Sequence, residues 1–292
     1  MTTKTKLVQS IQQAYPDFQY ETVRLNGGEG QFNHILIVDE SIIFRFPRYA
    51  PQIKNLKREV NLLKMLQGKL PIPVPNPIYY SSGARSVGKV FMGYQLLPGR
   101  SLWRAYLQTI KDKATRKRLA KQLAAFLVSL HQLPVDLLDG QFEDHDGIEY
   151  WADMYRSIRE DLMPLMNVDG VTQISRHFED FLGEAQNHAY VPAIRHGDFG
   201  GSNILFDPNT RKISGIIDFG SAGLGDPAVD LAAVSTYGEP FFEMICENYP
   251  GVDALLRRAR FYHGTFALQE ALHGFHSGDQ EAFENGMAAY RD

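Results

Sequence analysis

Cysteine is nearly absent from this chain of 292 residues, since Cys246 is its one cysteine. A single cysteine excludes a disulfide within the chain and fits the reducing interior of a cell. No neighbouring residue in the segment 242–246 could act as an activating base for the thiol. We therefore expect Cys246 to be a packed helix residue rather than a nucleophile.

Several other features are missing as well. No stretch approaches the roughly 18 consecutive apolar residues of a membrane span, and no apolar segment of a secretory signal follows the lysines of residues 1–6. No dense basic tract indicates nucleic-acid binding, and the histidines lack metal-ligand spacing, so we expect no zinc. The sequence thus predicts a cytoplasmic protein that binds neither membrane nor nucleic acid.

The composition is that of an ordinary globular protein, with 44% apolar and 22% charged residues. The length exceeds that of one typical compact core and suits two lobes around a cleft. Basic residues outnumber acidic ones two to one over residues 1–99, and the ratio reverses over residues 192–292. This asymmetry suits a basic lobe for nucleotide phosphates and an acidic lobe for a cationic substrate. The alternative is that these charges are scattered over a solvated surface.

The first part of the chain alternates strand-like segments with helical ones. Apolar residues recur every three or four positions from Pro51 to Leu66, which predicts a long helix that ends near Gly68. Four prolines within residues 70–77 exclude a helix or a central strand there. A short helix is predicted at 6–15, and strands are predicted at 20–25, 33–38, 41–46, 78–81 and 89–96.

Beyond residue 97 the pattern becomes mostly helical. We place the lobe boundary there, with a nucleotide-binding lobe at 1–97 and a catalytic and substrate-binding lobe at 98–292. His131 closes one helix, where we expect it to act as a cap favoured by the helix dipole, a functional role being the alternative. Helices are predicted at 117–132, 148–165, 171–188, 226–237, 239–248, 252–273 and 279–290.

The most informative pattern lies between residues 196 and 220. Asp198 is followed five residues later by Asn203, and Asp218 comes directly after the apolar residues of 213–217. Phosphoryl transfer needs one carboxylate beside the attacking hydroxyl, and an amide oxygen and a second carboxylate that hold magnesium on the triphosphate. The three residues in this order, flanked by strand-like segments, indicate such a site. The alternative is two polar turns beside a hairpin.

The segment His196-Gly197-Asp198 with Asn203, followed by Ile216 to Gly220, resembles the aminoglycoside phosphotransferase family. That family is related to the macrolide phosphotransferases and the choline-kinase-like enzymes, and all share a protein-kinase-like fold. The 2''-type aminoglycoside kinases look most similar, and the resemblance covers nearly the whole chain. Further matching segments, in the family's order, are 28–30, 42–47, 59–63, 127–131, 225–227 and 230–231.

The resemblance implies an α+β, bilobal kinase-like fold: a five-stranded antiparallel sheet with one long helix, then a mostly helical lobe. It implies Mg²⁺ as cofactor and ATP or GTP as phosphate donor. Asp198 would orient the acceptor hydroxyl or take its proton, and Asn203 and Asp218 would bind Mg²⁺. His196 would support the loop. For Asp198, the alternative is a turn residue that bonds its own backbone.

On the nucleotide side, Gly28 and Gly30 would form a lid whose backbone N–H groups approach the phosphates, although glycines between strands also fit a simple turn. Arg45 is the main departure from the family, whose members usually have a lysine there, paired with a glutamate that would be Glu59. Macrolide kinases resemble this chain in having arginine. Two alternatives follow: Arg45 merely packs its stem on the sheet, or the protein binds nucleotide without catalysis.

The segment that follows the last predicted strand of the first lobe would be the hinge that contacts the purine. The resemblance implies that Tyr94, Gln95 and Leu97 bind the nucleotide there. Tyr94 would lie near the back of the base pocket and narrow it, which would favour guanine over adenine.

The acceptor is the least determined part. An aminoglycoside carries several ammonium groups and calls for carboxylates beyond the catalytic ones. Glu239, Glu243 and Glu270 are the candidates, of which we assign Glu239 and Glu270, together with Asp198, to substrate binding. Exposed helix carboxylates are the alternative for all three. An aminoglycoside is the first expectation, and a macrolide or an amino alcohol the second. A monomer is expected.

Overall fold

The computed structural model describes residues 2–26, 33–81, 83–138, 144 and 146–291. The chain forms two compact units, the first made of residues 1–129 and 201–222, and the second of residues 130–200 and 223–292. Asn203 and Asp218 thus belong to the first unit and Asp198 to the second. The division into lobes at residue 97 stays a prediction.

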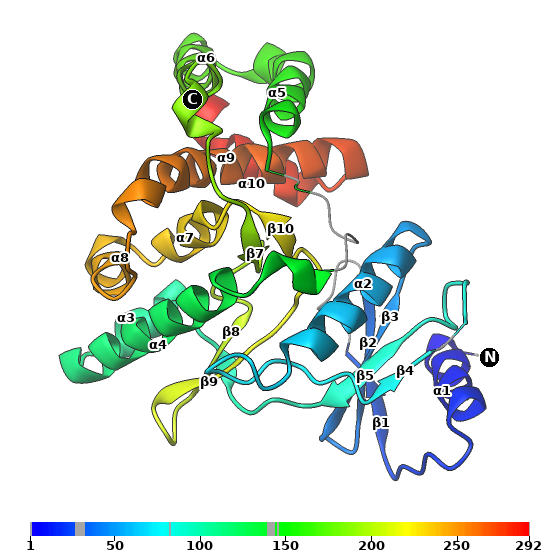
Figure 1. Ribbon diagram of the computed structural model, residues 1–292. Helices are drawn as coiled ribbons and strands as arrows, with labels where there is room; N and C mark the ends of the chain where they lie inside the picture. The colour runs from blue at the N-terminus through cyan, green and yellow to red at the C-terminus, as the bar shows by residue number, and fades with distance from the viewer. Residues whose placement is uncertain (1, 27–32, 82, 139–143, 145, 292) are drawn as a thin grey trace. The chain divides into compact units, whose positions relative to one another are not determined.

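The first unit contains a five-stranded antiparallel sheet of order β1-β2-β3-β5-β4 (Figure 1). The five predicted strands are confirmed, although β1, β4 and β5 are shorter than predicted. Between β2 and β3, Asp39 and Glu40 both have positive φ, at 49° and 47°, as in the mirror-image turns of tight hairpins. The strands are β1 (Val23–Leu25), β2 (Asn33–Val38), β3 (Ile42–Pro47), β4 (Tyr79–Tyr80) and β5 (Met92–Gln95).

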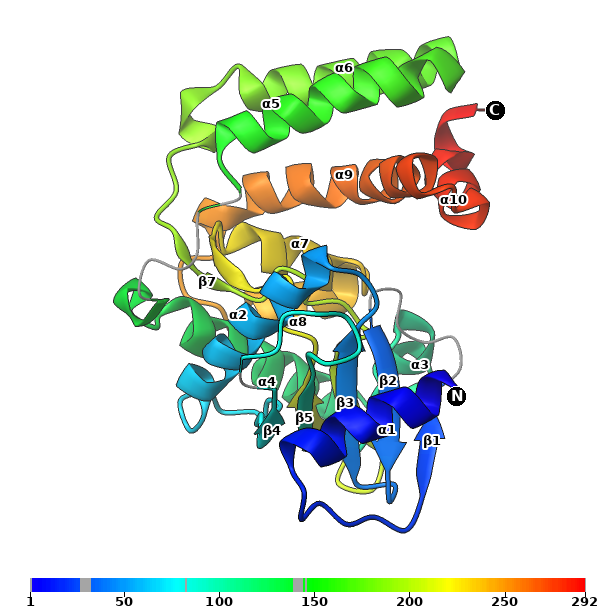
Figure 2. The same ribbon diagram turned by 90° about the vertical axis from the view of Figure 1, so that its right-hand side faces the viewer.

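The two faces of this sheet differ because side chains alternate along each strand. On one face Phe44 and Phe46 join an apolar core with Leu7 and Ile11 of helix α1 (Thr3–Ala14). Figure 2 shows α1 running across the strands. On the other face, Arg45 meets helix α2 (Pro51–Leu66), which begins at a proline as predicted. The sheet therefore separates a purely apolar layer from a layer that contains charged groups.

A second, three-stranded sheet of the first unit has the order β6-β8-β9. Its strands are β6 (Arg100–Ser101), β8 (Ile204–Asp207) and β9 (Lys212–Ile216). The unit also contains α3 (Arg104–Thr109) and most of α4 (Lys113–His131). Helix α4 begins four residues before the predicted position because the Asp112 carboxylate accepts the backbone N–H groups of Ala114 and Thr115. The elements β6 and α3 were not predicted, since both are too short to show a period.

The second unit is mostly helical, as predicted. Helix α9 packs against α7 and α10. The predicted helix at 171–188 ends six residues early, at Leu182, and the helix at 148–165 continues beyond α5 as a π turn and a 3-10 turn. None of the helices in the described part of the chain is both long and apolar enough to cross a bilayer. The elements are α5 (Ile148–Ser157), α6 (Val168–Leu182), β7 (Ala193–Arg195), β10 (Gly223–Gly225), α7 (Ala228–Ser235), α8 (Glu239–Cys246), α9 (Asp253–Ser277) and α10 (Gln280–Arg291).

Candidate active site

Arg45 is the centre of a buried ionic cluster in the first unit. Its side chain, on β3, is 8% exposed. One terminal nitrogen, Nη1, donates to Glu59 Oε1 at 2.6 Å, and the other, Nη2, donates to Asp218 Oδ1 at 2.9 Å. These bonds exclude the alternative that Arg45 merely packs its stem on the sheet. They also identify Glu59 of α2 as its partner, while a role for either residue in nucleotide binding stays a prediction.

The planar guanidinium explains how one side chain serves two carboxylates, because its nitrogens point in fixed, different directions. Burial alone would lower the pKa of Arg45, but the charges of Glu59 and Asp218 raise it above its ordinary value. Glu59 Oε1 also accepts the backbone N–H of Phe219 at 3.2 Å. The helix α2 is thereby tied both to β3 and to the segment that carries Asp218.

Asn203 and Asp218 lie at the same end of the hairpin formed by β8 and β9. Ile204 is paired with Ile216 in the register of the two strands. Beyond this pair, the Ile217 N–H donates to the Asn203 carbonyl at 2.9 Å. Asn203 comes directly before β8, and Asp218 follows β9 by two residues. The antiparallel pairing therefore brings together two positions that are 15 residues apart in the sequence.

The backbone of Asp218 is in an unusual conformation, with φ of +62°. A non-glycine residue there carries a strain of about 1–3 kcal/mol, and such strain concentrates at functional sites. The Asp218 side chain is 48% exposed, whereas Asn203 is buried. A carboxylate and an amide at the end of one hairpin supply the oxygen donors that Mg²⁺ prefers, so the residues fit this ion. Within the described ranges, no three His, Cys, Asp or Glu side chains form a metal-binding group.

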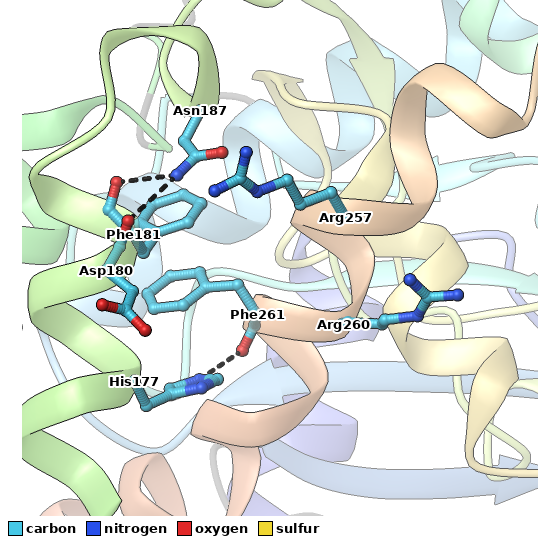
Figure 3. Close-up of a pocket in the computed structure, with 7 residues that line it drawn as sticks. All are labelled: His177, Asp180, Phe181, Asn187, Arg257, Arg260 and Phe261. Carbon is cyan, nitrogen blue, oxygen red and sulfur yellow. Dashed lines mark hydrogen bonds between the residues drawn. The ribbon is translucent and has the colours of Figure 1, made fainter.

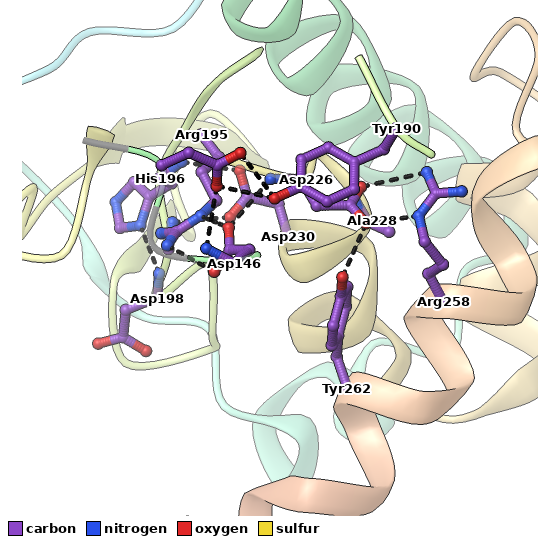
Figure 4. Close-up of polar contacts among 12 residues, drawn as sticks. Asp146, Tyr190, Arg195, His196, Asp198, Asp226, Ala228, Asp230, Arg258 and Tyr262 are labelled. Carbon is purple, nitrogen blue, oxygen red and sulfur yellow. Dashed lines mark hydrogen bonds and ion pairs between the residues drawn. The ribbon is translucent and has the colours of Figure 1, made fainter. Parts of the chain in front are cut away.

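In the second unit, Asp230 holds the backbone of the loop that leads to Asp198. Its fully buried carboxylate accepts the His196 N–H on Oδ2 and the Gly197 N–H on Oδ1, both at 2.8 Å (Figure 4). The Asp198 N–H then donates to His196 Nδ1 at 3.2 Å. These contacts agree with the prediction that His196 supports the loop.

His131 has a different environment from the expected helix cap. It does end α4, but its ring Nε2 lies 3.0 Å from Asp230 Oδ2 and its Nδ1 lies 2.8 Å from the Tyr249 hydroxyl. These contacts were not predicted, because Asp230 is 99 residues away from His131 along the chain. Burial would raise the pKa of Asp230, but His131 and His196 together lower it below its ordinary value. The loop is therefore fixed by an ionised carboxylate at neutral pH.

A buried network beside this loop was not predicted. Arg195, the residue before His196, binds Asp146 through both Nε and Nη2, the latter at 2.9 Å from Oδ1. Asp146 Oδ2 also accepts the Asp226 N–H at 3.0 Å. A side chain at Gly225 would overlap the Asp146 carboxylate, so the network requires glycine there. Asp226 lies in the matching segment 225–227, but Asp146 belongs to no motif that could have revealed it.

The same network continues into α9. The Asp226 carboxylate accepts bonds from the Arg258 guanidinium and, at 2.8 Å, from the Tyr262 hydroxyl (Figure 4). Arg258 is buried near the start of α9, close to the exposed Arg257 and Arg260, and nothing in the sequence distinguishes it from them. Through Asp226 and Asp146, α9 is connected to the strand that precedes the Asp198 loop.

The predicted hinge begins in β5. Tyr94 is buried in that strand, Gln95 is exposed at its end, and Leu97 is partly buried. The Leu96 N–H donates to the Ser41 carbonyl at 2.7 Å, so the segment continues the sheet for one residue. Gly28 and Gly30, the predicted lid, lie outside the described residues.

A family model described as the phosphotransferase enzyme family matches residues 22–262. The chain belongs to this family. It is 27% identical over 268 residues to viomycin phosphotransferase of Streptomyces vinaceus, and the aligned region covers 90% of this chain and 91% of that relative. The resemblance inferred from the motifs is therefore confirmed.

Two solved structures have folds similar to that of this phosphotransferase. The GDP and kanamycin complex of APH(2")-IIIa has a TM-score of 0.88 at 24% identity, covering 97% of this chain and 96% of that one. Macrolide 2'-phosphotransferase type I has a TM-score of 0.77 at 21% identity, covering 100% and 98%. The predicted kinase-like α+β fold is thus confirmed.

One hollow of the phosphotransferase, within its second unit, contains a predicted acceptor residue. Glu239 and Glu243 of α8 line this hollow of about 500 Å³, with Arg260 and His263 of α9 on the other side. Burial and the carboxylates of Glu239, Asp253 and Glu243 raise the pKa of the adjacent Cys246 thiol to about 11.

Burial is the largest cause of the raised pKa of Cys246, and the neighbouring carboxylates add to it. Cys246 itself is the last residue of α8 and partly buried, as expected for a packed helix residue. Glu270, the other predicted acceptor residue, is exposed farther along α9.

A second hollow, of about 330 Å³, lies between α6 and α9 (Figure 3). Its polar groups bind one another: His177 Nε2 contacts the Phe261 carbonyl at 3.0 Å, and the Asn187 amide donates to the Phe181 carbonyl at 2.9 Å. Arg257 pairs with Glu184 at 2.5 Å. Asp180 and Arg260 also line this hollow, and Arg260 lines the one beside Glu239 as well.

Proposed function

We propose that this phosphotransferase transfers the γ-phosphate of ATP or GTP to a hydroxyl group of a small molecule. The observation that carries the proposal is the cluster in which Arg45 binds Glu59 and Asp218 at once. A guanidinium held in a fixed orientation beside Asp218 is suited to binding nucleotide phosphates. Bound Mg²⁺, held by Asn203 and Asp218, would neutralise charge on the triphosphate. The glycines Gly28 and Gly30 would cover the phosphates, and Tyr94, Gln95 and Leu97 would contact the base.

Asp198 is the proposed catalytic residue, which orients the acceptor hydroxyl or takes its proton. Catalysis of phosphoryl transfer depends on positioning, so a catalytic carboxylate must be held in place. The bonds that Asp230 accepts from the two preceding backbone N–H groups, of His196 and Gly197, support this role. The proposal includes the two-lobe division at residue 97, the cytoplasmic location and the monomeric state.

The proposed acceptor is an aminoglycoside. The carboxylates of Glu239 and Glu243, which line the hollow of about 500 Å³ together with Arg260, support a cationic acceptor, and APH(2")-IIIa was solved with kanamycin. Because the curated relative is named for viomycin, that antibiotic is a second cationic candidate. Arg45 favours a macrolide as a further candidate, since macrolide kinases resemble this chain there. An amino alcohol and a catalytically silent nucleotide-binding protein are the remaining alternatives.

A coupled nucleotide-turnover screen tests the proposal. ATP and GTP would each be supplied with Mg²⁺ and panels of aminoglycosides, macrolides, amino alcohols and viomycin. We expect turnover that depends on an acceptor and that Asp198→Asn abolishes while nucleotide binding survives. Asp153→Asn, an exposed position on α5, is the matched control and should leave turnover unchanged. Nucleotide binding without turnover for any acceptor would favour the silent homologue.

A further inference from the structure

A chain of hydrogen bonds in the second unit joins Tyr249 to the loop that carries Asp198. The Tyr249 hydroxyl lies 2.8 Å from His131 Nδ1, and His131 Nε2 lies 3.0 Å from Asp230 Oδ2. Asp230 in turn accepts the two backbone N–H groups that precede the one of Asp198. Each group in this chain is therefore bonded to the next, from the Tyr249 side chain to the backbone of the loop.

The chemistry of the three side chains sets the direction of these bonds. An ionised carboxylate only accepts, so His131 Nε2 carries a hydrogen and donates to Asp230. His131 Nδ1 accepts from the Tyr249 hydroxyl when the ring is neutral and donates to it when the ring is charged, because a hydroxyl can do both. Burial, and then the charges of Asp230 and Asp226, raise the pKa of Tyr249 to about 12, so the hydroxyl keeps its hydrogen at physiological pH.

The Tyr249 hydroxyl supplies the second of two contacts that the imidazole of His131 needs. A single bond at Nε2 leaves the plane of the ring variable, whereas bonds at two different ring atoms define it. The rings of His131 and Tyr249 are tilted by 56° with centroids 5.9 Å apart, so they do not stack face to face. The His131 side chain is 4% exposed, which leaves water little access to replace the hydroxyl at Nδ1.

Tyr249 is also tied to the helix that carries the candidate acceptor residues. Its backbone N–H donates to the carbonyl of Cys246, the last residue of α8, at 3.0 Å. Glu239 and Glu243 lie on the same helix and line the hollow of about 500 Å³. Hydrogen bonds thus connect the helix of these carboxylates to the loop of Asp198. Phosphoryl transfer requires an acceptor and a catalytic carboxylate that are held in register, which such a connection can provide.

We propose that Tyr249 is a positioning residue for phosphoryl transfer, whose hydroxyl holds the His131 ring against Asp230 and thereby holds the loop of Asp198 in place relative to α8. The proposal rests on the proposed function and adds to it a residue outside the family motifs. It predicts that the Tyr249 hydroxyl acts through His131 Nδ1 and has no effect on the loop when that nitrogen is absent.

A double-mutant cycle tests this role, with the parent, Tyr249→Phe, His131→Gln and the double variant. Tyr249→Phe keeps the ring and removes only the hydroxyl. His131→Gln has an amide nitrogen that can take the place of Nε2 and donate to Asp230, but it has no group in the place of Nδ1. We expect Tyr249→Phe to lower kcat about 3- to 10-fold in the parent and less than about twofold beside His131→Gln, with KM for the nucleotide changed less than about twofold.

Amide hydrogen exchange, measured by NMR on the nucleotide-free protein, is a readout that does not depend on turnover. It follows the N–H groups of His196 and Gly197, which Asp230 accepts. We expect Tyr249→Phe to accelerate exchange of both about 5- to 50-fold in the parent and not in the His131→Gln background. Leu268, buried in the middle of α9, reports the opening of the unit as a whole, and its N–H should change much less.

Tyr155→Phe is the matched control. It also removes a hydroxyl that joins two elements of the second unit, since Tyr155 of α5 donates to Glu179 Oε1 of α6 at 3.1 Å, and it should change neither kcat nor exchange in the loop. If no variant transfers phosphate while the exchange rates still depend on both Tyr249 and His131, the proposed function fails and the positioning contact stands.

Three outcomes would overturn the inference. If Tyr249→Phe has the same effect in both backgrounds, the hydroxyl acts independently of His131. If it accelerates exchange at Leu268 as much as at Gly197, the hydroxyl contributes to stability in general and not to the loop. If it raises KM for the acceptor and leaves kcat and loop exchange unchanged, the role of Tyr249 is confined to α8.

Discussion

Replacing Asp230 by asparagine is a direct test of how firmly the loop before Asp198 is held. The two side chains have nearly the same shape, but asparagine has one oxygen where aspartate has two. Each Asp230 oxygen accepts a different backbone N–H, from His196 on Oδ2 and from Gly197 on Oδ1. In the variant, the amide nitrogen must face one of these donors, so that N–H loses its acceptor.

The magnitude follows from the burial of this site. A buried N–H left without an acceptor costs about 1–3 kcal/mol. The remaining bonds, including the one from His131, change from charge-assisted to neutral and weaken by about 0.5–1 kcal/mol each. We therefore expect Asp230→Asn to lower the free energy of unfolding by about 2–5 kcal/mol. We also expect kcat to fall with little change in nucleotide affinity, because Asp198 loses its support.

Urea unfolding followed by tryptophan fluorescence measures the change in stability. The control is Asp153→Asn, which removes an exposed carboxylate paired with Arg156, where the two side chains are 67% and 66% exposed. Such a pair contributes below about 1 kcal/mol. If Asp230→Asn proved no more destabilising than the control, the claim that Asp230 fixes the loop would be refuted.

Three further predictions concern the same unit. The pKa of Asp230 in the folded protein is lower than its ordinary value of 3.8. Its ionised carboxylate therefore stabilises the fold fully above about pH 3.8, and this stabilisation is lost as the pH falls through the folded-state pKa. The parent and Asp230→Asn should accordingly approach each other in stability in strong acid. Gly225→Ala should lower the thermal midpoint by several degrees, because the new methyl group must displace the Asp146 carboxylate from Arg195; an unchanged midpoint would contradict the buried network. Cys246, with a thiol pKa of about 11, should react slowly with iodoacetamide at pH 8 and faster up to pH 10, and a rate that levels off below pH 9 would be inconsistent with its environment.

The sequence predicted the elements whose signals are local. The strands at 33–38 and 41–46 and the helix that starts at Pro51 depend on residues within a few positions of one another, so the local sequence pattern reveals them. Glu59 was identified as the partner of Arg45 because the family pattern fixes both positions, 14 residues apart. The family resemblance supplied the expected roles of the residues in the candidate site.

The contacts that the sequence did not predict join residues far apart along the chain. Arg45 donates a hydrogen bond to Asp218, 173 positions away in the sequence, and His131 is hydrogen-bonded to Asp230, 99 positions away. Neither contact is indicated by a hydrophobic periodicity or by a turn residue in the sequence. The Asp146 and Arg195 pair was missed for the same reason, since its geometry depends on how β7, β10 and the segment before α5 come together. Long-range polar contacts of this kind are determined by the packing of whole elements.

The binding of Mn²⁺, as a substitute for Mg²⁺, tests the central claim most directly. Electron paramagnetic resonance would measure Mn²⁺ affinity in the presence of a non-hydrolysable triphosphate nucleotide. We expect Asp218→Ala and Asn203→Ala each to lower this affinity at least tenfold. Asp207→Ala, at the other end of β8, where the carboxylate binds Thr210 and the Asn209 N–H, should leave it unchanged. Affinity equal to that of the parent in Asp218→Ala would contradict a phosphotransferase that holds its metal between Asn203 and Asp218.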